Sequence, residues 1–319
     1  MKRKAKKPRI LISACLLGQK LRYDGTHARD SYLVNVLGRY VEWVPICPET
    51  ECGFSVPREP MRLRGDSASP RVVTIESNRD QTENIRRWAE RKFRDLEGAG
   101  LCGILLKSRS PSCGLSGVKV FGFNGAAPRS CGTGIFASAA VRRYPLIPAA
   151  DEERLKDPTA REAFIERLYA AMRWRDFTGN SPTLDGLTDF HEAHELLIQA
   201  HDPKSFPAME RLIRGAARMN RLKLFERYGA TMMSALGVAP STAKNTRALK
   251  MVFQRLSGGV SKEGASHLLS VIEDYRAGHV PFLVPLALLR HYVERADDKE
   301  LRRQFFFNPY PQELGLRAR

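Results

Sequence analysis

Three apolar stretches that each lead into a cysteine decide the expected fold: ILISAC (10–15), YVEWVPICPE (40–49) and LCGILLKSRSPSCG (101–114). Each starts as a short apolar run of the kind that forms a buried strand, and each cysteine stands at a turn with Pro, Gly or Ser close by. Ligands of α/β sheets collect outside the carboxyl ends of the strands. We therefore expect the three strands to bring their cysteines to one point: Cys15, Cys47 and Cys113.

Strand-like and helix-like segments alternate up to residue 150. Besides the three stretches above, apolar spacing predicts a helix near 30–38, a strand at 72–75, a helix over 80–97, a strand or hairpin at 117–123 and a helix that starts within 131–144. Residues 53–70, rich in Pro, Arg and Gly, are predicted to form a long loop. The alternation favours an α/β domain over residues 10–150 with a Rossmann-like three-layer sheet.

The pattern changes at residue 151. Residues 151–180 are predicted to form a helical linker, and residues 181–319 an all-α domain with helices at 184–201, 204–219, 221–236, 241–257, 261–277 and 284–295. HEAH (191–194) is not the HExxH metalloprotease motif, because its histidines are three residues apart. His194 and His201 fall on an apolar helix face, so we expect core or interface histidines. The last segment, from residue 305, has no period and is expected to pack as an extended tail.

The chain of 319 residues carries a net charge of +17, shared as +12 over residues 1–180 and +5 over residues 181–319. The first nine residues supply six positive charges and are expected to be a disordered tail. Such a balance favours a polyanionic partner, most simply nucleic acid; the alternative is a soluble basic enzyme. The segments 211–227 and 241–255 are strongly basic within predicted helices and suit RNA docking, although solvated helix faces also have this composition.

Cysteine usage and hydropathy favour a cytoplasmic protein. All six cysteines lie within the first 131 residues, and a chain of this size does not need disulfides. The apolar run before Cys15 has about five residues, which is too short for a lipoprotein signal. No apolar run reaches the roughly 18 residues that a membrane span needs, so we expect no membrane partner.

Three thiolates leave an iron–sulfur cluster or a metal ion one ligand short, and a substrate can bind at the open position. The other cysteines are expected to be non-ligands, and Cys102 to be a small buried hydrophobic residue. The chain has no CxxC pair, which weakens zinc-ribbon and thioredoxin interpretations. A zinc site built from Cys15, Cys47 and Cys113 remains a weaker alternative.

Polar residues close to these cysteines are candidates for catalysis or substrate binding. Glu49 lies two residues after Cys47. The loop before Cys113 offers Lys107, Ser108, Arg109, Ser110 and Ser112, and the LRYDG segment offers Arg22, Tyr23 and Asp24. Hydroxyls can orient water or a polar ring edge, and Lys and Arg can hold phosphate. The alternative is ordinary turn chemistry, because Asp-Gly and Ser-Pro form turns without any catalytic role.

Taken together, the motifs resemble those of a bacterial family of thiouracil desulfidases. They are SACLLG (13–18) with RYDG (22–25), CPE (47–49) with VPREP (56–60), and LLKSRSPSCG (105–114). The second half, with DFHEAHELLIQAH (189–201), resembles a helical domain often fused to that family. Fused versions are similar to enzymes that remove sulfur from 4-thiouridine in tRNA, so the resemblance covers nearly the whole chain.

The resemblance implies a [4Fe-4S] cluster held by Cys15, Cys47 and Cys113, with a free iron that captures the thione sulfur of the substrate. C=S becomes C=O and sulfide is released without electron transfer, assisted by Glu49 and by a serine. By position this serine is Ser108, with Ser110 and Ser112 as competitors. Many members have a cysteine where this chain has Leu21, and a glycine where it has Cys52. Neither position belongs to the implied ligand set.

The predicted function is therefore the non-redox desulfuration of thiolated uracil, with 4-thiouridine in tRNA as the substrate and the helical domain as the RNA-binding part. Two alternatives stay open. The enzyme could act on free thiouracil or other small thiolated pyrimidines, with the helical domain serving assembly. The chain could instead be a nucleic-acid-binding sensor with a regulatory cluster, which Cys52 or Cys131 as a fourth ligand would favour.

Overall fold

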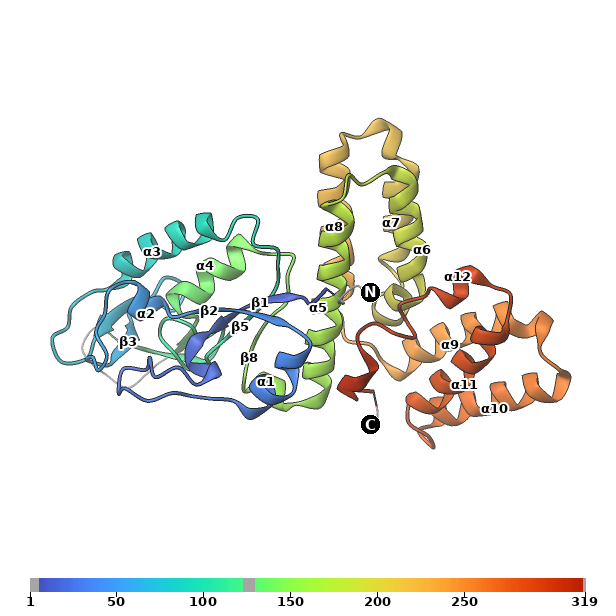
Figure 1. Cartoon of the computed structure of the whole chain (residues 1–319), viewed down its shortest axis with the longest axis horizontal. Helices are drawn as coiled ribbons and strands as arrows, with labels where there is room; N and C mark the ends of the chain where they lie inside the picture. Colours follow the sequence, from blue (N-terminus) through green and yellow to red (C-terminus); the bar gives the residue numbers. More distant parts are fainter. Residues whose placement is uncertain (1–5, 123–129, 318–319) are drawn as a thin grey trace, which may run out of the picture. The chain divides into compact units, whose positions relative to one another are not determined.

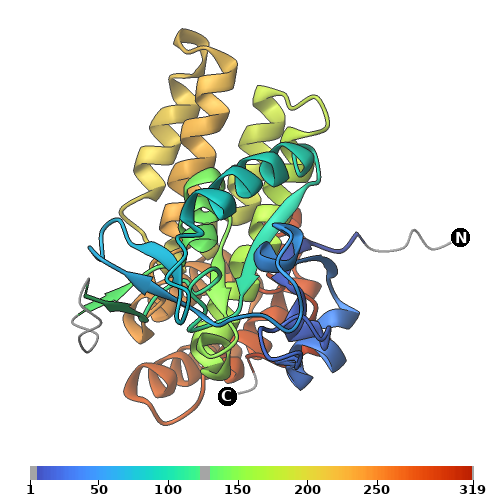
Figure 2. The ribbon, with the colours of Figure 1, turned by 90° about the vertical axis from the view of Figure 1, so that its left-hand side faces the viewer.

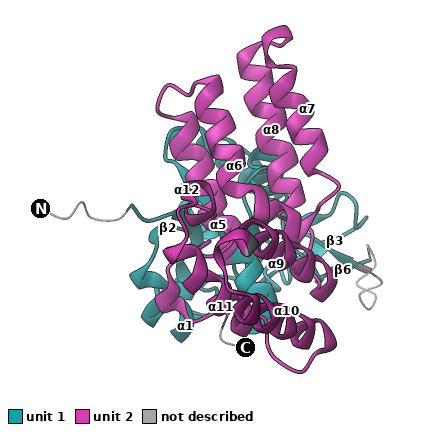
Figure 3. Ribbon diagram, turned by 90° about the vertical axis from the view of Figure 1, so that its right-hand side faces the viewer, with its two compact units in different colours: residues 1–164 teal, residues 165–319 magenta. Residues whose placement is uncertain are grey.

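The computed structural model of the chain describes residues 6–122 and 130–317. It divides into two compact units, residues 1–164 and residues 165–319 (Figure 3), and the division falls within helix α5 (Pro158–Thr178). The first unit is α/β and the second is helical in its described residues, which confirms the predicted fold class. Part of the predicted basic tail, residues 1–5, lies outside the described residues.

The main sheet of the first unit is parallel. Its strands lie in the order β2–β1–β5–β8, with the bounds β1 (Arg9–Ser13), β2 (Glu42–Ile46), β5 (Leu101–Leu106) and β8 (Ala149–Asp151). The chain runs from β1 outward to β2 and then crosses back to β5 on the other side of β1. The strand order therefore reverses between β1 and β5, and a crevice at the carboxyl ends of the strands forms at such a switch point.

Helices cover both faces of this sheet. Figure 1 shows α3 (Thr82–Asp95) and α4 (Ile135–Arg143) side by side on one face and α1 (Ser31–Asn35) on the other. Side chains alternate along a strand, so Leu11 packs with the core under α3 and α4 while Ile10 points the other way, and both are fully buried. This arrangement confirms the three-layer prediction.

A second sheet has the strand order β4–β3–β6–β7, and its strands lie at the left of Figure 2. Their bounds are β3 (Met61–Arg64), β4 (Arg71–Thr74), β6 (Val118–Phe121) and β7 (Ser130–Gly132). β3 pairs antiparallel with β4 and parallel with β6, and β6 pairs antiparallel with β7.

Two expectations about the first unit were wrong in detail. The predicted loop 53–70 contains β3, because two arginines in MRLR mask an apolar pattern whose Leu63 is fully buried. The stretch 10–15 ends as a strand at Ser13, and Cys15 lies in a 3-10 turn (Ala14–Leu17). The helix predicted to start within 131–144 is confirmed as α4, although β7 precedes it. β8 was not predicted, and the end of the predicted segment 117–123 lies outside the described residues.

The second unit continues α5 and adds seven α-helices among its described residues: α6 (Leu184–His201), α7 (Phe206–Arg214), α8 (Arg221–Ala235), α9 (Thr242–Leu256), α10 (Lys262–Ala277), α11 (Leu283–Arg295) and α12 (Lys299–Arg302). Short polar side chains cap the start of several of them, because they accept N–H groups that the first turn leaves unbonded. Thr183 accepts from the Gly186 N–H, and Asn220 from the Leu222 N–H. The six predicted helices are confirmed, and α12 is additional.

Buried polar and aromatic groups hold the second unit together. His194 is fully buried; its Nδ1 bonds to the Phe190 carbonyl at 2.7 Å, and its Nε2 accepts from Arg173 at 3.0 Å. His201 is buried as well, so both histidines belong to the core, as predicted. The final segment packs through buried Phe306 and Phe307. In the described part of the chain, no helix has the length and apolar character to cross a membrane.

Candidate active site

A cavity of about 470 Å³ lies at the carboxyl ends of the parallel strands. The turns that follow β1, β2 and β5 build its wall and contribute the three cysteines that the sequence singled out: Cys15, Cys47 and Cys113. All three side chains belong to the lining of this one cavity. We call this cavity the thiol pocket.

Backbone hydrogen bonds fix two of the cysteines. Gly18 closes the turn around Cys15 by donating its N–H to the Cys15 carbonyl at 3.2 Å. Cys47 is the N-cap residue of α2 (Pro48–Glu51), and its N–H donates to Oε1 of Glu51 at 2.9 Å. Glu51 also pairs with Lys92 of α3 at 2.8 Å, which ties this turn to the helix layer. Both thiols are thereby placed on the wall of the thiol pocket.

The loop that carries Cys113 is wound around Ser110 and docked on α4. The Ser110 hydroxyl accepts from the N–H groups of Ser112 and Cys113, at 3.2 and 3.1 Å. The Ser112 carbonyl accepts from the Ala137 N–H in the first turn of α4, at 3.1 Å. This approach requires a glycine at position 134, because a Cβ there would lie 2.6 Å from the Ser112 backbone.

Burial favours the protonated form of two of these thiols, Cys15 and Cys113. Burial raises the pKa of Cys15 to about 11, and the nearby Cys47 adds to the effect. Burial raises the pKa of Cys113 well above its usual range, and Ser13 opposes this through a hydrogen bond to the sulfur. Metal binding replaces such protons and yields thiolate ligands.

The spacing of the thiols bears on which metal group they could hold. Among the residues that the structure describes, no three His, Cys, Asp or Glu side chains are arranged to hold a single metal ion. The zinc alternative is therefore not supported. Three soft donors around a larger cavity fit a polynuclear cluster, which spreads its ligands over several metal atoms.

The remaining cysteines do not line the thiol pocket. Cys52 lies against α3, with its sulfur 3.9 Å from the Asn84 carbonyl. Cys102 is fully buried in β5, and Cys131 is exposed in β7. A fourth protein ligand from Cys52 or Cys131, which the sensor alternative needs, finds no support in these positions.

Glu49 lies on the pocket wall and is held from both sides. Its Oε2 accepts from Nε of Arg58 at 2.9 Å and from Nη2 of the same guanidinium. Its Oε1 accepts from the Ser112 hydroxyl at 2.9 Å. The Arg58 side chain is almost fully buried, and it also donates to the Leu21 carbonyl at 3.0 Å. These charge-assisted contacts fix one orientation of the Glu49 carboxylate at the pocket.

Ser108 lies on the same wall within a polar group formed with two neighbours. Its hydroxyl donates to Oε1 of Glu152 at 2.6 Å, and its N–H donates to Oε2 at 2.8 Å. The Lys107 ammonium pairs with Glu152 and donates to the Ser108 hydroxyl at 3.1 Å. A hydroxyl next to a buried carboxylate and an ammonium can pass a proton from a bound water to the carboxylate.

Comparison with known proteins agrees with this geometry. Residues 10–152 match the family model of 2-thiouracil desulfurase. Over 154 residues, the chain is 32% identical to the uncharacterized protein YbbK of Bacillus subtilis (strain 168), covering 98% of that protein and 46% of this chain. The chain belongs to the thiouracil desulfidase family. Residues 195–311 of this desulfidase-family chain match a family of unknown function, DUF1722.

Two further similarities were found for this member of the desulfidase family. It is 22% identical over 157 residues to the uncharacterized protein YbgA of Escherichia coli (strain K12), covering 93% of that protein and 49% of this chain. Among solved structures, it is 36% identical to the [4Fe-4S]-dependent thiouracil desulfidase TudS, and the match covers 47% of this chain and 95% of that one with a TM-score of 0.39.

The structure gathers most, though not all, of the predicted site residues at the thiol pocket of this desulfidase-family chain. Besides the three cysteines, the lining includes Glu49 and Ser108 together with Arg22, Tyr23, Lys107, Arg109 and Ser110. Ser112 is fully buried behind the wall, where it contacts Glu49. Asp24 does not line the pocket; it accepts from the Thr26 N–H at 3.0 Å, as an ordinary turn residue does.

Three residues with a clear place in the site were missed in the sequence. Arg58 stands within the VPREP motif, so the motif itself was a usable signal. Glu152 follows β8, a strand too short to be recognised, in a charged segment. Ser13 ends β1 and accepts from the Lys107 N–H at 2.9 Å, which links the ends of β1 and β5. Ser13 is the first residue of the SACLLG motif, so this motif was a usable signal as well.

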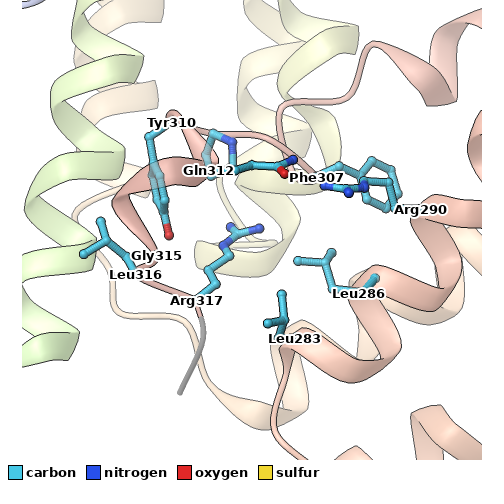
Figure 4. A pocket seen from close by; sticks show the side chains of 11 residues that line it. Leu283, Leu286, Arg290, Phe307, Tyr310, Gln312, Gly315, Leu316 and Arg317 are labelled. Atoms are coloured by element: carbon cyan, nitrogen blue, oxygen red, sulfur yellow. The ribbon is translucent and has the colours of Figure 1, made fainter. Parts of the chain in front are cut away.

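A separate cavity of about 280 Å³ lies in the second unit of this desulfidase-family chain (Figure 4). Figure 4 shows the Arg317 side chain between Tyr310 and Leu286. The Arg317 guanidinium donates to Oε2 of Glu166 at 3.1 Å. Burial would raise the pKa of Glu166, but the adjacent His201 and Arg317 lower it to about 2. These ionic contacts fasten the chain end to the helices, and the described wall of the cavity carries no cysteine.

Proposed function

We propose that this protein hydrolyses the thione of a thiolated uracil, with 4-thiouridine in tRNA as the substrate. In this reaction C=S and water become C=O and hydrogen sulfide, without electron transfer. One observation carries the proposal: three thiols from three separate strand ends line one pocket together with Ser108 and Glu49. The match to the desulfurase family model over residues 10–152 supports the same reaction class.

The cofactor proposed for this site is a [4Fe-4S] cluster held by Cys15, Cys47 and Cys113. The donor set fits, because it offers three soft thiolates around a pocket and no arrangement for a single ion among the described residues. An iron without a protein ligand supplies a Lewis acid with affinity for sulfur. We place the reaction in the cytoplasm, where a reducing environment keeps cysteines available as metal ligands.

The side chains of the pocket are assigned roles by their contacts. The Ser108 hydroxyl holds the attacking water and takes its proton while passing its own proton to Oε1 of Glu152. Lys107 keeps both groups in place through its ammonium. Glu49, fixed by Arg58 and Ser112, accepts an N–H of the pyrimidine ring and orients it. The proton on Glu152 returns to the departing sulfur. The second proton of the water leaves the added oxygen as C=O forms and completes hydrogen sulfide.

Contacts within the loop favour Ser108 over the other two serines. The Ser110 hydroxyl already accepts two backbone N–H groups, which makes it a loop-forming residue. Ser112 is fully buried and donates to Glu49. Ser108 alone of the three combines a place on the pocket wall with a carboxylate that can receive its proton.

RNA binding by the second unit is supported by cations that no carboxylate of the described residues neutralises. In α9, Lys250 pairs with Glu273 at 2.7 Å, and Arg255 lies within 4 Å of three carboxylates. On α7 and α8 and the turn between them, five exposed cations have no ion pair with any described residue: Arg211, Arg218, Arg221, Lys223 and Arg227. Figure 3 shows these helices next to each other. In α9, Arg247 is the one exposed cation without an ion pair among the described residues. We therefore assign the main phosphate contacts to the α7–α8 hairpin, which has five such cations.

The test is an anaerobic assay of the full chain. We expect brown protein with iron–sulfide absorbance that releases sulfide from 4-thiouridine-containing tRNA, and the Cys113→Ala variant to lose both properties. The Cys52→Ala variant serves as the control, because this residue lies against α3 outside the thiol pocket. Release from free 4-thiouracil alone would restrict the substrate to the free base. Protein that stays iron-free after anaerobic reconstitution would refute the cluster.

A further inference from the structure

The thiol pocket is continuous with two further cavities of the first unit. It shares Met61, Ile75, Arg109 and Pro111 with a cavity of about 650 Å³ that runs over β3 and β6. This second cavity in turn shares Gly117 with a third cavity of about 380 Å³ beside α3 and α4. The second and third cavities together are called the lateral groove. It leads away from the cysteines along the second sheet.

The charge of the lateral groove is positive and unbalanced. Its lining includes Arg62, Arg109 and Lys119 in the second cavity and Arg86 and Arg142 in the third, without any Asp or Glu among the described lining residues. The thiol pocket differs, because carboxylates neutralise Arg58 and Lys107 there.

Most groove cations are available to a ligand. Arg62, Arg109 and Lys119 form no ion pair with a described residue, and Arg86 approaches Glu83 only at 3.8 Å in an exposed position. Arg142 donates to the Ser138 hydroxyl at 2.7 Å, which positions it without neutralising it. A surface that holds several cations and no anion fits a polyanion.

The junction between the pocket and the groove has further features of a binding surface. The Arg62 guanidinium lies 5.1 Å from the centroid of the Phe121 ring, and Arg62 Nε is buried without a hydrogen-bond partner among the described residues. Arg109 has a φ of 59°, a left-handed conformation that is costly for a residue other than glycine and that clusters at functional sites. Single-stranded nucleic acids bind where cations follow the backbone and aromatic rings receive bases.

We propose that the lateral groove binds the sugar–phosphate backbone of a single RNA strand next to the base that occupies the thiol pocket. The inference rests on the proposed function for the identity of that base. Arg109 meets the phosphate nearest the pocket, Arg62 and Lys119 follow, and Arg86 with Arg142 bind the most distant phosphate. The target base must leave its stack to enter the pocket, and this costs least when the strand is already unpaired.

The first experiment measures RNA binding without any chemistry. Fluorescence anisotropy of a sulfur-free single-stranded RNA is recorded as a function of salt for the full chain and for two double variants, Arg62→Gln/Lys119→Gln and Arg86→Gln/Arg142→Gln. We expect the slope of log K against log[salt] to fall by about 0.7 for each cation removed. Arg87→Gln is the matched control, because Arg87 is an exposed residue of α3 outside the groove. Unchanged slopes in both double variants would refute RNA binding in the lateral groove.

The second experiment separates the groove from the chemistry. Sulfide release is measured with free 4-thiouracil and with short RNA strands that carry one 4-thiouridine and flanks of increasing length. The double variants should raise KM for the longer strands about tenfold, if each loses two phosphate contacts, and leave the free base unaffected. An equal loss on both substrates would overturn the proposal. The wild type could desulfurate neither substrate while the double variants still lower the salt slope of RNA binding. That result would refute the proposed function and support RNA binding in the lateral groove.

Discussion

The hydroxyl of Ser108 donates a 2.6 Å hydrogen bond to Oε1 of Glu152, 44 residues further along the chain. The two residues follow β5 and β8, which are neighbouring parallel strands, so the sheet itself brings them together. Glu152 is buried and its two oxygens accept from Ser108 and Lys107, which satisfies a charge that would be costly to bury alone. The fold thus places a carboxylate directly behind a hydroxyl of the pocket wall.

Replacing Glu152 with Gln should lower kcat for sulfide release by about 100-fold while KM changes little. The amide keeps the size of the side chain but cannot take the proton that Ser108 passes on. The measurement is steady-state kinetics under anaerobic conditions with matched cluster content. The adjacent Glu153→Gln is the control, because Glu153 is exposed and pairs with Lys156. An E152Q enzyme with wild-type kcat would rule out the proton path through this carboxylate.

The three serines of the loop should respond differently to alanine. Ser108→Ala should lose most of kcat and keep its cluster. Ser110→Ala removes the acceptor of two N–H groups next to Cys113, so it should destabilise the protein by about 1 kcal/mol and lower cluster occupancy. Ser112→Ala should change kcat modestly by freeing one oxygen of Glu49. Iron content, thermal unfolding and kinetics of the three variants decide the assignment; a fully active S108A would contradict it.

Local signals made the cysteines predictable, whereas their polar partners were not. Cys15, Cys47 and Cys113 follow apolar runs and stand beside Pro, Gly or Ser, so each pattern lies within a short stretch of sequence. Glu152 becomes meaningful only through pairing of β5 with β8, and β8 has three residues. Long-range pairing of this kind leaves no periodic trace in the sequence.

The strands of the second sheet were also hard to predict from the sequence. β3 has the sequence MRLR, in which alternate arginines hide the strand pattern. Its neighbours in the sheet are far apart in sequence, because β4 precedes α3 whereas β6 follows β5. The helices of the second unit were predicted well, because their apolar periodicity is local and residues such as Asn220 and Ser261 cap them.

Only three of the six cysteines should matter for the cofactor. Cys15→Ala, Cys47→Ala and Cys113→Ala should each abolish the iron–sulfide absorbance, because each removes one of the three thiolates of the pocket. Cys52→Ala and Cys131→Ala should keep it, since neither lines the pocket. Absorbance and iron analysis after anaerobic reconstitution give the result. Loss of the cluster in C52A or C131A alone would revive a fourth protein ligand and a sensor role.

Removal of charge from the α7–α8 hairpin should weaken tRNA binding. In the Arg218→Gln/Arg221→Gln/Lys223→Gln variant, the slope of log K for tRNA against log[salt] should fall. The expected decrease is about 0.9 for each lost contact with a duplex phosphate. The comparison is Lys250→Gln, whose cation already pairs with Glu273 within the unit. It should bind tRNA as the wild type does. The reverse result, with weaker binding only in K250Q, would place the RNA on α9.

His191 should make the second unit less stable as the pH falls. It is buried, Nδ1 contacts the Tyr228 hydroxyl at 3.0 Å, and Nε2 has no partner among the described residues. Burial lowers the pKa of His191 to about 4, whereas the pKa of an unfolded histidine is about 6.5. Between these values the unfolded chain gains a proton that the folded chain does not bind. Above the unfolded pKa, neutral His191 does not reduce the free energy of unfolding. As the pH falls from the unfolded pKa toward the folded pKa, the free energy of unfolding decreases, by about 3 kcal/mol in total.

The His191→Phe variant isolates this effect, because phenylalanine keeps the ring that stacks on Phe206 and cannot titrate. Urea unfolding of the full chain is followed through Trp174, whose ring lies 5.2 Å from that of Tyr228, with the other two tryptophans replaced by Phe. The fall in stability between about pH 6.5 and pH 4.5 should be smaller in the variant, and His279→Gln, an exposed histidine, should leave it unchanged. Identical pH slopes in wild type and H191F would mean that burial does not hold His191 neutral.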